Sequence, residues 1–330
     1  MTSLNTKFLC GSVCGILVAT LPQALQAQDP VEGDTAIVLR GSQVELLFDG
    51  AVVTEGPAVA PDGTVYFSDI TPTASTGMEA GHLRQYDPAT GITRIFRSPS
   101  GMSNGIIFDD QGRMIVAEGA DFGGRRVTRT DLKTGKSTIL AGLYLGKAFN
   151  APNDLALDEQ GRIYFTDPRY FGHEPVEQPV EGVYRIDPDG SVSLLVTEID
   201  KPNGILVSPD QRTLYVAAVG GTDQAIFAFD LGPGGSVSGG RTLIDFSPGP
   251  GPDGMAVDLD GNIYAARRPQ PMGIYVYSPE GQQLALIPTP EQPRNVTFGR
   301  GATSRTLFIA AGRSLYMIEV QREGYHAARR

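Results

Sequence analysis

Six oxygen-bearing side chains stand at the same position in six related stretches of the sequence. They are Glu55, Asn104, Asn153, Asn203, Asp253 and Asn295, separated by 49, 49, 50, 50 and 42 residues. Carboxylate and amide oxygens are the ligands that a hard cation such as Ca²⁺ prefers. Asn and Asp also occur at strand starts because they tolerate turn geometry, but a Glu is poor in turns. Their common position therefore favours one shared cation site.

The stretches that carry these residues have the pattern of β-hairpins. Examples are "EGPAVAPDGTVYFSD" from Glu55, "NDLALDEQGRIYFTD" from Asn153 and "DGMAVDLDGNIYAAR" from Asp253. Each has an apolar run, a turn with Gly and a second β run. Two further strand patterns follow, as in "GVYRIDPDGSVSLLV". Four strands in a repeat of about 50 residues are typical of a propeller blade. The sequence predicts an all-β, six-bladed β-propeller with four-stranded blades.

The last repeat lacks an outer strand, whereas "QVELLFDG", residues 43–50, precedes the first blade without a partner. Pairing the two would close the ring and remove an exposed strand edge. We predict one propeller domain over residues 43–320. Residues 28–42 are expected to be a loose lead-in segment, and residues 321–330 a frayed C-terminal tail.

Each of the six residues Glu55, Asn104, Asn153, Asn203, Asp253 and Asn295 is the first residue of its hairpin, and we call them the first residues. Equivalent positions of successive blades converge on the central channel of a propeller, so the first residues are expected to meet there. Two carboxylates among them would neutralise a divalent cation, and the amides would complete its shell. The histidines are His82, His173 and His326, and none is a first residue. The two cysteines lie in the N-terminal apolar segment. A soft-ligand zinc or copper site is therefore disfavoured. One divalent cation is predicted, Ca²⁺ foremost, with Zn²⁺, Mn²⁺ and Mg²⁺ as alternatives.

Four segments resemble the SMP-30/gluconolactonase family of six-bladed propellers: "TEGPAVAPDGTVYFSD", "NAPNDLALDEQGRIYFTDPRYFG", "KPNGILVSPD" and "GPDGMAVDLDGNIYAA". The family's members are lactonases, with relatives that hydrolyse organophosphates, and they hold a divalent metal at the channel mouth. The resemblance implies metal ligands at Glu55, Asn153, Asn203 and Asp253. It makes Asn104 a substrate or outer-shell contact and Asn295 a structural residue of the channel.

One departure from the family pattern bears on the substrate. Sugar-acid-specific members carry an Arg two residues before the Asn that matches Asn153, and here that residue is Ala151. This argues against a sugar lactone. Opening a lactone needs a polarised carbonyl and an activated water, and we expect Asp253 to be the general base. Tyr170 and His173, in the loop "DPRYFGHEP", are candidate substrate contacts.

Acidic residues also end the second strand of three hairpins: Asp69, Glu118 and Asp167. We expect these acidic residues to lie at the rim of the propeller that is far from the first residues. The simple interpretation is that they have a structural role there. For Asp167 a second interpretation stays open, because the loop that follows it is long enough to fold over the channel.

The N-terminus has the layout of a cleaved signal peptide, residues 1–27. Lys7 precedes the apolar run "FLCGSVCGILVATL", and small Ala27 precedes Gln28. The mature chain is expected to be periplasmic or secreted. Without Lys7 it has 26 basic and 37 acidic residues. Nucleic acid and membrane surfaces are therefore poor partners. A metal-dependent lactonase is the leading hypothesis; a phosphotriesterase-like hydrolase and a non-catalytic exported binding propeller are the alternatives.

Overall fold

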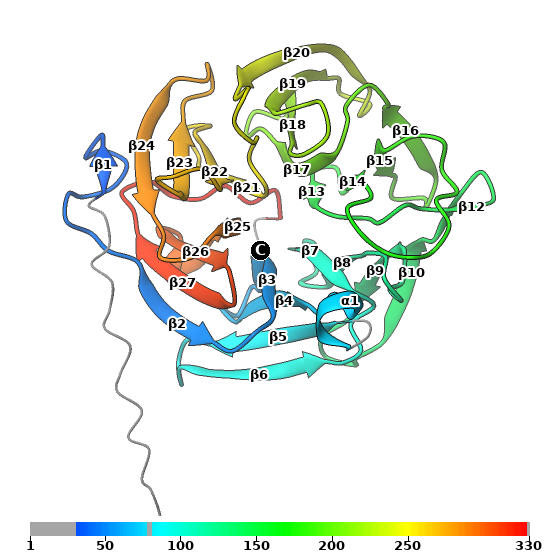
Figure 1. Ribbon diagram of the computed structural model, residues 1–330, viewed down its shortest axis with the longest axis horizontal. Helices are drawn as coiled ribbons and strands as arrows, with labels where there is room; N and C mark the ends of the chain where they lie inside the picture. Colours follow the sequence, from blue (N-terminus) through cyan, green and yellow to red (C-terminus); the bar gives the residue numbers. More distant parts are fainter. Residues whose placement is uncertain (1–30, 78–80, 329–330) are drawn as a thin grey trace, which may run out of the picture.

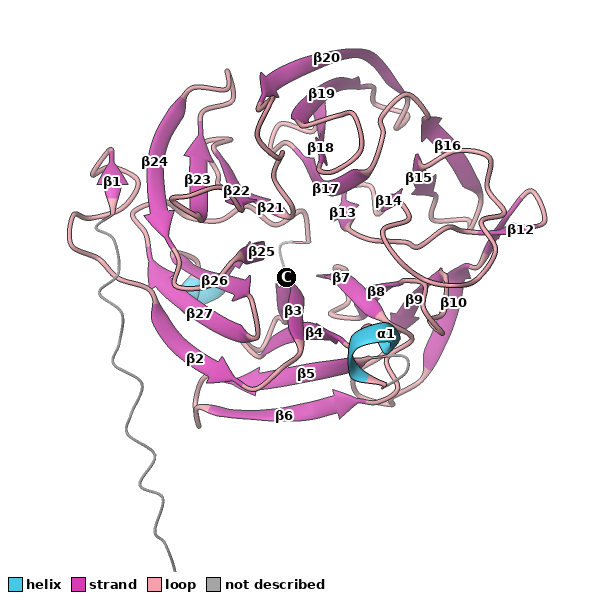
Figure 2. Cartoon of the chain, viewed as in Figure 1, coloured by secondary structure: helices cyan, strands magenta, loops and turns pink. Residues whose placement is uncertain are grey.

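The computed structural model describes residues 31–77 and 81–328, and the predicted signal peptide lies outside them. The described chain forms seven sheets, and six of them are blades arranged radially around a central channel (Figure 1). Figure 2 shows that the blades are strand and loop, with one short α-helix, α1 (Thr73–Thr76), and a 3₁₀ turn, η1 (Gly301–Thr303). No helix in the described part is long and apolar enough to cross a membrane. The predicted all-β, six-bladed propeller is confirmed.

Each blade is an antiparallel meander whose first strand lines the channel. Blade 1 contains β3 (Val53–Val59), β4 (Val65–Ile70), β5 (His82–Asp87) and β6 (Ile92–Arg97). Blade 2 contains β7 (Ser103–Phe108), β8 (Met114–Glu118), β9 (Arg126–Thr130) and β10 (Ser137–Ala141). Blade 3 contains β13 (Leu155–Leu157), β14 (Ile163–Asp167), β15 (Gly182–Ile186) and β16 (Val192–Val196). A small hairpin of β11 (Leu143–Tyr144) and β12 (Lys147–Ala148) separates blades 2 and 3.

The remaining blades follow the same order. Blade 4 contains β17 (Pro202–Val207), β18 (Thr213–Ala218), β19 (Ala225–Leu231) and β20 (Val237–Asp245). Blade 5 contains β21 (Met255–Val257), β22 (Ile263–Arg267), β23 (Gly273–Tyr277) and β24 (Gln283–Pro288). Blade 6 contains β25 (Pro293–Phe298), β26 (Thr306–Ala311) and β27 (Ser314–Glu319).

The strand before the first blade closes the ring, as predicted. β2 (Glu45–Asp49) pairs antiparallel with β27, and the register sets Glu45 opposite Met317 and Asp49 opposite Ser314. The last sheet thereby gains its fourth strand from the other end of the domain. This pairing satisfies the outer edge of β27 and joins the two ends of the propeller.

Adjacent blades pack their faces against each other and form the core. Between blades 2 and 3, Ile115 from β8 packs with Phe149, Phe165 and Tyr184, all with at most 1% of their surface exposed. Phe149 meets Phe165 edge-on at a ring-centre separation of 5.1 Å. Strands buried on both faces explain the near-continuous apolar runs that follow each first residue.

Two terminal segments differ from expectation. The lead-in is packed rather than loose: β1 (Glu32–Gly33) pairs with β24, and Ile37 and Val38 are each 1% exposed. The described tail, residues 321–328, is not frayed, because Tyr325 is buried and its backbone N–H donates to the Val257 carbonyl. In both cases long-range contacts to the propeller hold a segment whose own sequence has no strand pattern.

Candidate metal and catalytic site

Hydrogen bonds between blades bring the six first residues into one ring at the end of the channel. Ser68 Oγ, on β4, donates to the carbonyl of Asn104 in the next blade at 2.7 Å. Thr166 Oγ1, on β14, does the same to Asn203 at 2.7 Å. The N–H of Gly105 donates to the Asn153 carbonyl, also at 2.7 Å. The backbones of Asn104, Asn153 and Asn203 are thus each positioned by a neighbouring blade.

Glycine follows four of the first residues because the neighbouring strand passes too closely for a side chain. A Cβ at Gly56, where φ is +48°, would lie 2.0 Å from the carbonyl oxygen of Asn104. One at Gly254 would lie 2.1 Å from Cγ of Asn295. These contacts hold the ring tight, and they make the Glu-Gly, Asn-Gly and Asp-Gly pairs part of the site's construction.

Buried carboxylates stand close together in this ring. Glu55 is 5% exposed and Asp253 is 3% exposed. Burial, followed by the negative charge of Asp253, raises the pKa of Glu55 to about 8. Asp154, the residue after Asn153, is also buried, and burial together with Asp253 raises its pKa to about 7. The ring therefore concentrates negative charge that a cation would relieve.

The amide side chains supply neutral oxygens beside these carboxylates. Nδ2 of Asn203 donates to the hydroxyl of Tyr170 at 3.0 Å, which leaves Oδ1 as the atom for a cation. Asn153 and Asn104 line one small pocket with Tyr170. Asn295 lies elsewhere in the ring: its Oδ1 accepts the Val296 N–H, and its side chain is hydrogen-bonded to Asp154.

This donor set fits a hard divalent cation. Within the described residues, no group of three or more His, Cys, Asp or Glu is placed to hold a metal ion. A cation bound here would rely on the two carboxylates of Glu55 and Asp253 together with the amide oxygens of Asn153 and Asn203. Oxygen ligands of mixed charge suit Ca²⁺.

Two arginines at the site were not predicted from the sequence. Nη2 of Arg268 lies 2.6 Å from Oδ2 of Asp253, and Nη1 of Arg294 lies 4.0 Å from the same oxygen. Asp154 was also missed. It directly follows the first residue Asn153, at the position where four other repeats have Gly. Since both guanidinium contacts use Oδ2, Oδ1 of Asp253 is the oxygen left for a cation or a water.

The sequence matches the family model described as SMP-30/gluconolactonase/LRE-like region over residues 53–313. The chain belongs to this family. The gluconolactonase of Zymomonas mobilis subsp. mobilis is 32% identical over 318 residues, covering 88% of this chain and 84% of the relative. A gluconolactonase structure from Xanthomonas campestris is 30% identical, with a TM-score of 0.77 and coverage of 88% and 95%. Pentonolactonase XacC of Haloferax volcanii is 26% identical over 257 residues, covering 74% of this chain and 77% of the relative.

The acidic residues at the ends of the second strands lie at the same rim as the first residues, not at the far rim. Asp69 pairs with Thr54, beside Glu55, and Glu118 pairs with Ser103. The prediction was wrong because an antiparallel hairpin returns to the level at which it began. Asp167 accepts the N–H groups of Asn150 and Ala151, at 2.8 and 2.7 Å, and is fully buried. Its role is structural: it fixes the segment that leads into Asn153.

The loop after Asp167 reaches the site through Tyr170 but not through His173. The Tyr170 hydroxyl contacts Asn203 and donates to the Val219 carbonyl at 3.1 Å. His173 instead packs against Phe122, with the rings tilted by 46° and their centres 3.9 Å apart, and its Nδ1 lies 3.4 Å from Oδ1 of Asp121. Of the two predicted substrate contacts in this loop, only Tyr170 lines a pocket with Asn104 and Asn153.

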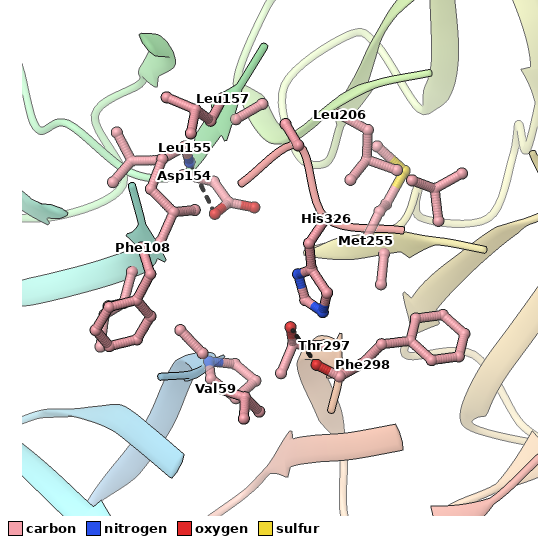
Figure 3. A pocket seen from close by; sticks show the side chains of 18 of the residues that line it. Val59, Phe108, Asp154, Leu155, Leu157, Leu206, Met255, Thr297, Phe298 and His326 are labelled. Carbon is pink, nitrogen blue, oxygen red and sulfur yellow. Dashed lines mark hydrogen bonds between the residues drawn. The ribbon is translucent and has the colours of Figure 1, made fainter. Parts of the chain in front are cut away.

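A second cavity lies inside the channel, beyond the ring. Its volume is about 130 Å³, and its walls are the residues that follow the first residues along the inner strands. Figure 3 shows Asp154 and His326 directed into it from different sides. His326 belongs to the C-terminal tail, which therefore closes the channel at the end away from the ring. A nitrogen of its ring, Nε2, lies 3.0 Å from the Gly299 carbonyl oxygen.

Proposed function

We propose that this protein is a divalent-metal-dependent lactone hydrolase. The observation that carries the proposal is the buried pair of Glu55 and Asp253 at the channel mouth, with the amides of Asn153 and Asn203 in the same ring. Membership of the family and its relatives named gluconolactonase and pentonolactonase support lactone hydrolysis. Metal dependence and the identity of the ion, Ca²⁺ first, are parts of the proposal.

Different residues of the site have different roles in the proposed reaction. A bound divalent cation would polarise the lactone carbonyl and lower the pKa of a water molecule. Glu55, Asn153 and Asn203 would hold the cation. Asp253 would contribute one oxygen to it and act as the general base that takes a proton from the attacking water. The water oxygen bonds to the carbonyl carbon, the ring C–O bond breaks, and the ring oxygen leaves as a hydroxyl after taking from Asp253 the proton that Asp253 removed from the water.

The wall beside the ring indicates which lactones fit. The small pocket next to Asn104, Asn153 and Tyr170 is otherwise lined by apolar or small residues: Ile70, Met102, Gly119, Ala120, Ala151, Pro152 and Phe171. These side chains offer no hydrogen bonds to a polyhydroxylated ring. Together with Ala151, which stands where sugar-acid-specific members carry an Arg, this favours a lactone with an apolar substituent over a sugar lactone.

The test is a substrate screen on protein stripped with a chelator and reloaded separately with Ca²⁺, Zn²⁺, Mn²⁺ or Mg²⁺. The panel contains glucono-1,5-lactone, γ-butyrolactone, dihydrocoumarin and the phosphotriester paraoxon. We expect metal-dependent lactone opening and faster turnover of dihydrocoumarin than of gluconolactone. A Glu55→Gln/Asp253→Asn double variant, prepared identically, controls for contaminating hydrolases. Turnover of paraoxon alone would replace the lactonase proposal by the phosphotriesterase one, and no metal-dependent turnover would leave a binding protein.

A further inference from the structure

Two arginines from different blades converge on the carboxylate of Asp253. Arg268 follows the end of β22, and Arg294 lies on β25 immediately before Asn295. Their side chains are 34% and 28% exposed, whereas that of Asp253 is 4% exposed. The guanidinium groups therefore stand on the solvent side of the buried carboxylate, between the ring and the mouth of the channel.

The charges at this position are not balanced once a cation is bound. For the described part of the chain, Asp253 is the acidic ion-pair partner of both Arg268 and Arg294. A divalent cation held by Glu55 and Asp253 would neutralise these two carboxylates. The three carboxylates of Glu55, Asp154 and Asp253 would then face the dication and the two guanidinium groups, so the mouth of the site would carry a net positive charge. Such a site attracts a negatively charged ligand.

The hydrogen-bonding groups of these arginines are incompletely used as well. Nε of Arg268 and Nε of Arg294 are both buried, and neither has a hydrogen-bond partner in the described structure. An arginine presents five N–H donors in a planar fork that matches a carboxylate. Two such forks beside the carbonyl-activating position suit the two oxygens of one carboxylate or an oxyanion.

We propose that Arg268 and Arg294 form an anion subsite that stabilises the oxyanion as water adds to the lactone and then holds the carboxylate of the opened hydroxy acid. This inference rests on the proposed function. Ring opening consumes one water and yields one hydroxyl and one carboxylic acid, which ionises and releases its proton to solvent. The arginines form no covalent bond and lose no proton during this reaction. They act through charge and hydrogen bonding.

Arg267 provides a matched control one residue away. Its guanidinium carbon lies 4.1 Å from the ring centre of Phe246 and 4.7 Å from that of Tyr275. Its Nη1 donates to the Tyr277 hydroxyl at 3.3 Å. These contacts hold it on the blade, so Arg267→Gln removes the same charge as Arg268→Gln without removing a contact to Asp253.

The experiment compares wild type with Arg268→Gln, Arg294→Gln, the double variant and Arg267→Gln. Calorimetry with metal-loaded protein measures binding of two ring-opened acids, 4-hydroxybutyrate and gluconate. We expect each single variant to bind the better of the two acids about 10-fold more weakly, the double variant to show no binding, and the control to stay within about twofold. We also expect the kcat of lactone opening to fall by about 10²-fold in each single variant, the usual effect of removing one oxyanion donor.

Binding of Ca²⁺ to the stripped proteins separates this role from a structural one. Removal of a like charge beside the cation should leave Ca²⁺ affinity unchanged or higher in Arg268→Gln. Loss of Ca²⁺ affinity there would mean that Arg268 only positions Asp253, and would overturn the proposal. So would equal binding of the acids by wild type and double variant, or no binding of either acid by wild type. Absence of lactone turnover in wild type would refute the proposed function by itself, while the calorimetry still decides whether the arginines bind carboxylates.

Discussion

Oδ1 of Asp167 accepts a hydrogen bond from the backbone N–H of Ala151 at 2.7 Å. The other carboxylate oxygen accepts the N–H of Asn150 at 2.8 Å. This carboxylate therefore pins the segment that enters blade 3 two residues before the predicted ligand Asn153. The arrangement connects a residue that has no contact with the candidate cation to the placement of one of its ligands.

Asp167→Asn is expected to cost about 1–3 kcal/mol of unfolding free energy, because an amide cannot accept both backbone N–H groups and its NH₂ would face one of them. Because Asn153 is then less well held, Ca²⁺ affinity should fall as well. Urea unfolding and Ca²⁺ calorimetry measure the two effects. Asp189→Asn, in an exposed turn of the same blade, is the control. Unchanged stability of Asp167→Asn would show that these hydrogen bonds do not fix the segment.

The ligand set predicts a graded loss of cation binding. Glu55→Ala removes a carboxylate and should weaken Ca²⁺ binding more than Asn153→Ala or Asn203→Ala, which remove neutral oxygens. Asn295→Ala should leave Ca²⁺ binding nearly intact, because that side chain is hydrogen-bonded to Asp154 and to its own strand. Calorimetric titration of chelator-stripped protein tests the order. An Asn295→Ala variant as defective as Glu55→Ala would require a different ligand set.

The lowered pKa of His326, in the C-terminal tail, predicts a pH dependence of the stability. Burial and the positive charge of Arg300 lower the pKa of His326 to about 4 from its ordinary value of 6.5. Between these values the unfolded chain binds a proton that the folded chain does not, so the free energy of unfolding falls as the pH falls. In metal-free protein, wild type should lose more stability than His326→Gln between pH 7 and pH 4.5. Parallel losses in urea unfolding would exclude His326 as a source of this dependence.

The signal peptide remains a prediction, since its residues lie outside the described structure. Export should remove residues 1–27 and leave an N-terminus close to Gln28. Mass spectrometry of the protein recovered from the periplasm or medium gives the answer directly. An intact Met1 on soluble, active protein would show that the segment is not cleaved.

The period of the sequence and its alternating apolar positions were sufficient to predict the six blades and the pairing of residues 43–50 with the last repeat. The position of the six first residues also followed from the repeat. Arg268 and Arg294 could not be found in that way, because the corresponding positions of the other repeats carry no arginine and the two side chains meet only through the contact between blades 5 and 6. Asp154 did carry a signal: it stands where Gly56, Gly105 and Gly254 stand in their repeats.

The tail and the lead-in show a different limit. Neither has a strand pattern, and each is held by contacts to distant residues, such as that of Tyr325 with Val257. Local sequence has little information about such packing. The rim assigned to Asp69, Glu118 and Asp167 was instead an error of geometry, since antiparallel pairing alone places the end of the second strand beside the start of the first.

The central claim is that Asp253 both binds the cation and accepts the proton of the attacking water. Asp253→Asn separates the two roles, because an amide oxygen still binds a cation but the amide cannot accept a proton. The decisive measurement is metal content and lactone turnover on the same preparation of this variant. We predict partial metal occupancy and a rate about 10²–10⁴-fold below wild type. Full metal occupancy with near wild-type turnover would contradict the account and make Asp253 a ligand only.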